Sequence, residues 1–127
     1  MKSKTDFTCV VTCMDGRIQH PVMEWIKEKT GIPYPDIVTE AGPVRAFFEG
    51  NQSVLESIYK RVDISLNNHG AKDIFIVAHH DCAGNPVEKN EQLQHLKKSI
   101  ETLRQKYPEA KVSGLWVNEN WEVEEIQ

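Results

Sequence analysis

The sequence predicts an α/β fold, a single domain over residues 1–127 with a mainly parallel sheet flanked by helices. Short apolar, β-branched runs alternate along the chain with longer runs in which apolar residues recur at helical spacing, the order typical of right-handed βαβ units. The short runs contain few polar residues, as expected for parallel strands covered on both faces. A length of 127 residues fits one domain that buries its own core. We therefore expect a sheet of roughly four or five strands.

The first predicted strand is expected to be central because Cys9-Val10-Val11 gives it an unbroken apolar stretch. Ala41-Gly42-Pro43 is interpreted as a break after the second strand. Residues 121–126 alternate between apolar and acidic side chains, and they are expected to pair with the preceding strand as a final hairpin. The expected strands are residues 6–13, 36–39, 73–78, 112–117 and 121–126.

Three helices are predicted from apolar residues at helical spacing. The first is expected to open at His20-Pro21, with Pro21 in its first turn, and to stop at Gly31. The second is expected to end with Gly70 as its C-cap, and the third to stop before Pro108. The expected helices begin near residues 20, 53 and 91.

The chain is mildly acidic, with 15 basic against 19 acidic side chains and no basic block. This distribution argues against nucleic acid or an anionic membrane as a partner. No apolar run has the length of a membrane span or the layout of an export signal, so a cytoplasmic location is expected. In a reducing compartment the three cysteines are interpreted as buried thiols, nucleophiles or metal ligands, not as a disulfide.

Two predicted strand ends are rich in chemically reactive side chains. The first strand leads into Cys13-Met14-Asp15-Gly16-Arg17, and the third into His79-His80-Asp81-Cys82-Ala83-Gly84. Ligands of open α/β sheets bind beyond the carboxyl ends of the strands, so both segments are expected to line one crevice. In the first segment Gly16 is expected to allow a tight turn, and in the second an offset of three residues lets His79 and Cys82 converge.

Cys13, His79 and Cys82 form a donor set of two thiolates and one imidazole. Such a set suits zinc, because soft sulfur ligands disfavour magnesium and calcium. The sequence leaves the fourth position open: water there gives an open catalytic site, and the Asp15 carboxylate there gives a closed one. In the open form Asp15 is expected to orient the nucleophile, while Arg17 keeps the carboxylate ionised and aimed.

The two motifs together resemble the zinc signature of the β-class carbonic anhydrases. Cys-x-Asp-x-Arg stands at 13–17, and His-x-x-Cys follows at 79–82 within Ile-Val-Ala-His-His-Asp-Cys-Ala-Gly. The Ala41-Gly42 turn and the strand at 112–117 are also similar to segments of that family, so the likeness covers nearly the whole chain. Thr39-Glu40 stands where the family has Arg-Asn, and the chain is short for a member.

The resemblance implies a function for each motif. Cys13, His79 and Cys82 would be the zinc ligands, and Asp15 with Arg17 the pair beside the metal, with Asp15 itself a ligand in the closed form only. The implied reaction is the reversible hydration of carbon dioxide to bicarbonate by zinc-bound hydroxide, which makes a small neutral molecule the substrate. It also implies a homodimer or larger homo-oligomer.

Three other functions remain open on the sequence alone. The same site would suit hydrolysis of carbonyl sulfide or carbon disulfide, since one nucleophile attacks any linear heterocumulene. Permanent ligation by Asp15 would instead make the chain a non-catalytic zinc-binding protein. An oxidoreductase with Cys13 and Cys82 as a redox pair is disfavoured, because it leaves Asp15 and His79 without a role.

Several further residues have a structural interpretation. Cys9 is predicted to be a core thiol, because a strand rises about 3.3 Å per residue and places it too far from Cys13 to share a metal. His80 is expected to face away from the metal and to cap the strand end, a role favoured over proton shuttling. Asp81 is expected either to accept a hydrogen bond from a loop amide, which is favoured, or to orient a ligand. Phe47 and Phe48 are left open between pocket lining and core, and the tryptophans are interpreted as packing or subunit contacts. No role is assigned to the histidines placed at helix edges or on a polar face: His20, His69 and His95.

Overall fold

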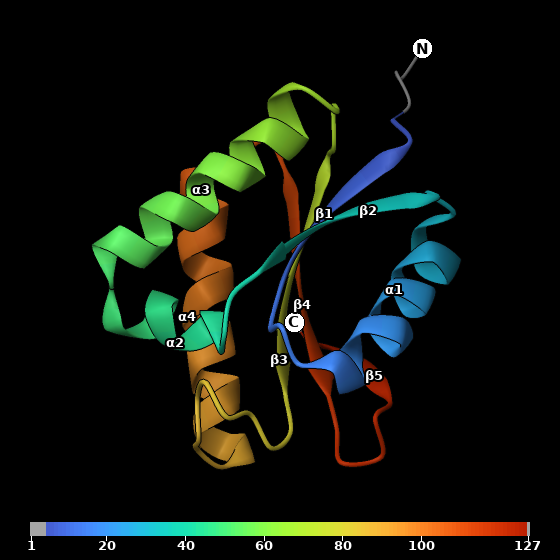
Figure 1. Cartoon of the computed structure of the whole chain (residues 1–127). Helices are drawn as coiled ribbons and strands as arrows, with labels where there is room; N and C mark the ends of the chain where they lie inside the picture. Colours follow the sequence, from blue (N-terminus) through green and yellow to red (C-terminus); the bar gives the residue numbers. More distant parts are fainter. Residues whose placement is uncertain (1–4, 127) are drawn as a thin grey trace.

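The computed structural model describes residues 5–126, in which a five-stranded sheet lies between two layers of helices (Figure 1). Its elements are β1 (Phe7–Thr12), α1 (Gly16–Thr30), β2 (Tyr34–Thr39), α2 (Pro43–Glu49), α3 (Gln52–Asn67), β3 (Asp73–His79), α4 (Lys89–Lys106), β4 (Lys111–Val117) and β5 (Val123–Ile126). The strand order is β2-β1-β3-β4-β5, and only the β4–β5 pair is antiparallel among these described strands. The predicted α/β class is confirmed.

The sheet separates two apolar cores. Cys9 and Val11 of β1 point to the side covered by α2, α3 and α4, whereas Val10 points to the side covered by α1, as the alternation of a strand requires (Figure 1). Cys9 is fully buried in the first core, which confirms its prediction as a core thiol. None of the described helices is long and apolar enough to cross a membrane.

The start of α1 differs from the prediction. The helix begins at Gly16 and not at His20, so Pro21 lies inside it and not in its first turn. The Asp15 carboxylate caps this earlier start by accepting a hydrogen bond from the Arg17 amide at 2.9 Å. Pro21 has no amide hydrogen, so the carbonyl of Arg17 loses its helical partner, a cost that the cap and the surrounding packing outweigh. Gly16 belongs to the helix and makes no tight turn, which corrects its predicted role.

Two other differences lie between β2 and β3. The Ala41-Gly42-Pro43 break also starts a helix, α2, in which Gly42 is the left-handed N-cap residue with φ 58° and Pro43 the first helical residue. The prediction of Gly70 as the C-cap of the following helix is wrong. That cap is Asn68, and Gly70, with φ 72°, lies in the turn that leads to β3.

Candidate metal centre

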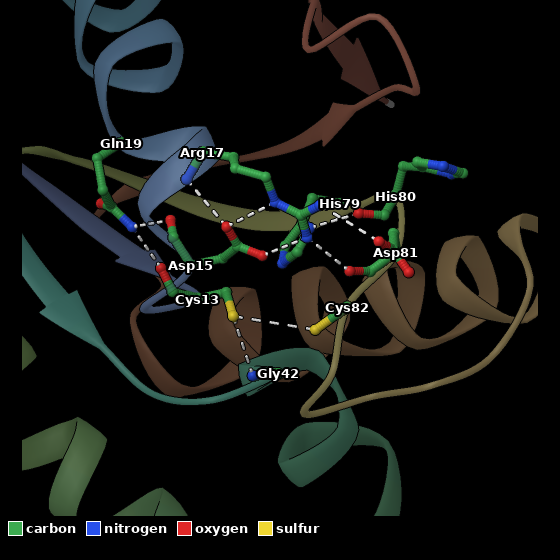
Figure 2. Close-up of polar contacts among 9 residues, drawn as sticks. All are labelled: Cys13, Asp15, Arg17, Gln19, Gly42, His79, His80, Asp81 and Cys82. Atoms are coloured by element: carbon green, nitrogen blue, oxygen red, sulfur yellow. Dashed lines mark hydrogen bonds and ion pairs between the residues drawn. The ribbon is translucent and has the colours of Figure 1, made fainter.

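The predicted meeting of two strand ends is present in the structure. β1 and β3 are parallel neighbours, so Cys13, directly after β1, lies beside His79, the last residue of β3. Cys82 approaches from the loop after β3, and all three side chains are buried. One donor atom from each residue lies within 4.8 Å of the other two. The sheet topology alone therefore brings a Cys-His-Cys set to one point (Figure 2).

The donor atoms fit a tetrahedral zinc ion. The two sulfur atoms are 3.9 Å apart, close to the separation of about 3.8 Å that zinc–sulfur bonds of about 2.3 Å give at a tetrahedral angle. Nδ1 of His79 lies 2.7 Å from the carbonyl oxygen of His80, which only accepts, so Nδ1 bears the proton and Nε2 has a free lone pair. Nε2 is buried and has no hydrogen-bond partner among the described residues. A metal ion bound by Nε2 would satisfy it.

The two thiols share one proton in the absence of metal. A hydrogen bond from the Cys82 thiol lowers the pKa of Cys13, against the opposing effect of burial. The Gly42 amide, 3.5 Å from the Cys13 sulfur, acts in the same direction. The pKa of Cys82 is raised because its proton is held by the Cys13 sulfur and because the thiol is buried. Metal binding must displace this proton, so the affinity is expected to rise with pH.

Two glycines set the distance between the loops that hold the thiols. A Cβ atom on Gly42 would lie 2.7 Å from the carbonyl carbon of Gly84, and one on Gly84 would lie 2.5 Å from the carbonyl carbon of Ala41. Both obstacles are backbone atoms, which do not move cheaply. The loop after β2 therefore touches the loop after β3, and this contact positions the Gly42 amide against Cys13.

Asp15 and Arg17 form a two-point ion pair beside the sulfur atoms. Arg17 donates from Nε to Oδ1 of Asp15 at 3.1 Å and from a terminal nitrogen to Oδ2 at 2.7 Å (Figure 2). These hydrogen bonds lower the pKa of Asp15 to about 2, despite the opposing effect of partial burial. Gln19 steadies the segment by donating to the carbonyl oxygens of Cys13 and Asp15. No motif in the sequence marks Gln19, which reaches these carbonyls from the first turns of α1.

Two more side chains reach Arg17 that were predicted to act elsewhere. Asp81 accepts a hydrogen bond from Arg17 at 3.2 Å, so its predicted bond from a loop amide is wrong. Trp121, from the hairpin before β5, lies with its ring 4.5 Å from the guanidinium carbon. His80 turns its ring away from the sulfur atoms, as predicted (Figure 2). Its ring packs edge-on against that of Trp121, with the ring centroids 6.2 Å apart. No local sequence signal marks Trp121, because only the tertiary fold brings it to Arg17.

Phe47 and Phe48 do not surround the metal centre. Phe47 is buried in the core, and Phe48 is half exposed and stacks on His95 at 4.1 Å. His95 itself is buried and bonded to the Asn85 side chain at 3.0 Å, so its predicted place at a helix edge or on a polar face is wrong. The surface hollow beside the metal centre is instead a groove of about 1100 Å³, whose lining includes Arg17, Cys82, Trp116 and residues 86–91.

Comparison with known proteins agrees with this arrangement. A family described as "Putative carbonic anhydrase" matches residues 3–127. Among solved structures, carbonic anhydrase from Glaciozyma antarctica is similar with a TM-score of 0.62 and 17% identity, over 97% of this chain and 82% of that one. The beta-carbonic anhydrase CcaA gives a TM-score of 0.59 and 11% identity, over 98% and 81%. At these identities the two structures show a shared fold. No curated protein matches the sequence.

Proposed function

Because the chain belongs to the carbonic anhydrase family, we propose that it is a zinc-dependent lyase that catalyses the reversible hydration of carbon dioxide to bicarbonate. The observation that supports this most directly is the unpartnered, buried Nε2 of His79 within reach of two cysteine sulfurs. A buried polar atom without a partner is costly in a folded protein, and a bound metal ion removes that cost.

Cys13, His79 and Cys82 would hold the zinc ion, with His80 orienting the imidazole through its carbonyl oxygen. When bound, zinc supplies a Lewis acid that lowers the pKa of water towards neutrality and so provides a nucleophile for carbon dioxide. The Asp15 carboxylate would accept a hydrogen bond from that nucleophile and so orient it for attack. Its low pKa keeps Asp15 ionised, and therefore an acceptor, at any pH used for assay.

The ion pair favours the open form of the site. Both carboxylate oxygens of Asp15 accept hydrogen bonds from Arg17, so ligation of a metal by Asp15 requires these bonds to be broken or shared. The fourth position is then left to water and substrate. This arrangement supports an enzyme over a permanently closed zinc-binding protein.

Stopped-flow measurement of carbon dioxide hydration tests the proposal. Zinc-loaded protein assayed between about pH 7 and 9 should accelerate hydration above the buffer rate, more strongly as the pH rises. The same protein stripped with a chelator and checked by elemental analysis is the control, and it should fall to the buffer rate. A zinc-loaded protein with no rate above buffer at any pH would show that the proposed reaction is wrong.

We also infer a cytoplasmic homo-oligomer, a dimer or larger. All three cysteines are buried and free, in agreement with a reducing compartment. The homo-oligomer is inferred from membership of the carbonic anhydrase family. Light scattering on the eluted zinc-loaded protein should give a mass at least twice 14.6 kDa, and a monomer at all concentrations would contradict the inference.

A further inference from the structure

Arg17 is held from three directions although its side chain is 46% exposed. Asp15 takes two of its hydrogen bonds. Asp81 takes two more, one to its carboxylate at 3.2 Å and one to its carbonyl oxygen at 3.0 Å. The ring of Trp121 covers the guanidinium at 4.5 Å. We call Asp81 and Trp121 together the Arg17 clamp, because they contact Arg17 from outside the ion pair that it makes with Asp15.

Both members of the clamp have an unusual backbone. In residues 5–126 the only non-glycine residues with positive φ are Asp81, at 57°, and Trp121, at 60°. This conformation is unfavourable for residues with a Cβ atom, and a bulky tryptophan gains no local compensation. Strained residues of this kind persist where the surrounding structure determines them, and they concentrate at functional sites. Here both of them direct a side chain onto the same arginine.

Each member is anchored by structure that is independent of Arg17. Asp81 lies between His79 and Cys82 in the sequence. The segment that positions these two candidate ligands therefore also positions the Asp81 carboxylate. Trp121 lies in the β4–β5 turn, where its amide donates to the carbonyl oxygen of Asn118 at 2.9 Å. The Asn118 side chain accepts from two further amides of the same turn, at 2.9 and 3.1 Å. The two anchors therefore stay in place whether or not Arg17 contacts them.

We propose that Asp81 and Trp121 are positioning residues that hold Arg17 on Asp15 and thereby keep the Asp15 carboxylate away from the metal's fourth position. Without the clamp, only Asp15 holds the arginine side chain, which then leaves toward solvent more readily. The released Asp15 carboxylate then becomes available as a fourth ligand. The expected loss of hydration activity rests on the proposed function. The expected move of the Asp15 carboxylate onto the metal does not.

The test weakens both contacts together, because an exposed ion pair alone contributes little, while the bond to the Asp81 carbonyl oxygen remains. Asp81→Asn deletes the charge and keeps a residue that tolerates positive φ, and Trp121→Leu deletes the aromatic face. In the double variant, kcat/KM for hydration should fall about tenfold, mainly through kcat, with an unchanged zinc content. In a second double variant, Trp121→Phe takes the place of Trp121→Leu and keeps an aromatic face. This variant should recover most of the lost kcat/KM.

Two readouts do not depend on activity. The visible spectrum of the cobalt-substituted double variant should differ from that of the parent protein, because an oxygen ligand from Asp15 changes the coordination of the metal. A crystal structure of the zinc-loaded double variant should show Asp15 on the metal and Arg17 displaced. Glu122→Gln neutralises an exposed carboxylate in the same hairpin and is the matched control, with unchanged kinetics and spectrum.

The outcomes separate the two proposals. A parent protein that is inactive, with a double variant in which Asp15 has moved to the metal, would support the clamp and contradict the proposed reaction. An active parent and a double variant with the same kinetics, the same cobalt spectrum and an intact Asp15–Arg17 pair would overturn the clamp. If the double variant does not fold, Asp81→Asn and Trp121→Leu are measured separately by the same spectrum and crystal structure. An unchanged spectrum and an intact Asp15–Arg17 pair in both would overturn the clamp.

Discussion

Two polar clusters lie toward opposite ends of the parallel strands. Only one of them contains a buried ligand nitrogen that has no hydrogen-bond partner. Near the start of β2, Asp36 accepts hydrogen bonds from Ser65 at 2.7 Å and from His69 at 2.8 Å. At the carboxyl ends of β1 and β3, the Cys-His-Cys set leaves Nε2 of His79 buried and unpartnered. The first cluster satisfies its polar groups internally, whereas the second requires something else to complete it.

The first cluster contains the residue types of a catalytic triad without its geometry. In a triad the histidine contacts the serine and the carboxylate contacts the histidine. Here Ser65 and His69 both bond the same oxygen of Asp36, so neither activates the other, and Phe7 stacks on the imidazole at 4.0 Å. Residue type therefore does not separate a structural cluster from a functional one. The convergence of three ligand atoms, one of them buried and without a hydrogen-bond partner, does.

The largest effect is expected when the histidine of the metal centre, His79, is replaced by alanine. The same substitution at His69, in the other cluster, serves for comparison. His79→Ala removes one of three protein ligands, and zinc affinity should fall at least about a hundredfold, with loss of hydration activity. His69→Ala, the matched control, should leave zinc affinity unchanged. Competition against a chromophoric chelator measures both. Equal zinc affinity in the two variants would contradict the assignment of His79 as a ligand.

The next effect concerns the two aspartates. Asp15→Asn keeps the size of the side chain and removes the carboxylate acceptor, so zinc should be retained while kcat/KM falls about a hundredfold. Asp36→Asn makes the same chemical change at the other cluster and should leave kcat/KM within about twofold, at some cost in stability. Zinc content by elemental analysis accompanies each assay. A fully active Asp15→Asn protein would mean that Asp15 does not orient the nucleophile.

A smaller effect is expected where backbone contact supports the metal centre. In Gly84→Ala the new Cβ meets the backbone of Ala41 at 2.5 Å, so the two loops must separate and the Gly42 amide must move from the Cys13 sulfur. Zinc affinity should fall about tenfold, as for other supporting contacts of a metal site, with a stability loss of about 1–3 kcal/mol. Gly16→Ala is the control, since nothing lies within 4 Å of its Cβ position. Equal zinc affinity in the two variants would show that the loop contact does not support the metal.

The sequence was sufficient for the features that depend on local pattern. Apolar runs located the strands, and because parallel strands end at one edge, Cys13, His79 and Cys82 were expected to converge, as they do. The start of α1 was misplaced because Pro21 is a strong local signal. The capping hydrogen bond that the Arg17 amide donates to the Asp15 carboxylate outweighs it, since that cap also orients the carboxylate for its ion pair.

Long-range contacts explain what the sequence did not predict. Gly42 adopts its left-handed conformation where the backbone of Gly84 touches it, a contact between loops 42 residues apart in the chain. Trp121 reaches Arg17 only because β5 pairs with β4 and the connecting turn lies beside the end of β3. Neither the Gly42–Gly84 contact nor the Trp121–Arg17 contact can be recognised from the sequence of a single helix or strand. The residues that support the site are therefore harder to predict than those that form it.

The smallest expected effect tests the internally satisfied cluster. Ser65→Ala removes a buried hydroxyl that bonds the Asp36 carboxylate, and the oxygen that loses this bond keeps the one from His69. The free energy of unfolding should fall by about 1–2 kcal/mol, without a change in zinc affinity.

Ser99→Ala is the matched control for this loss. The Ser99 hydroxyl is equally buried but bonds the carbonyl oxygen of His95 one helical turn earlier, so its removal leaves no charged group short of a partner. Its unfolding free energy should change by less than about 0.5 kcal/mol. Urea unfolding of both zinc-loaded variants measures the difference. If Ser65→Ala weakened zinc binding as much as Gly84→Ala does, the two ends of the sheet would be coupled, and the separation into one structural and one functional cluster would be wrong.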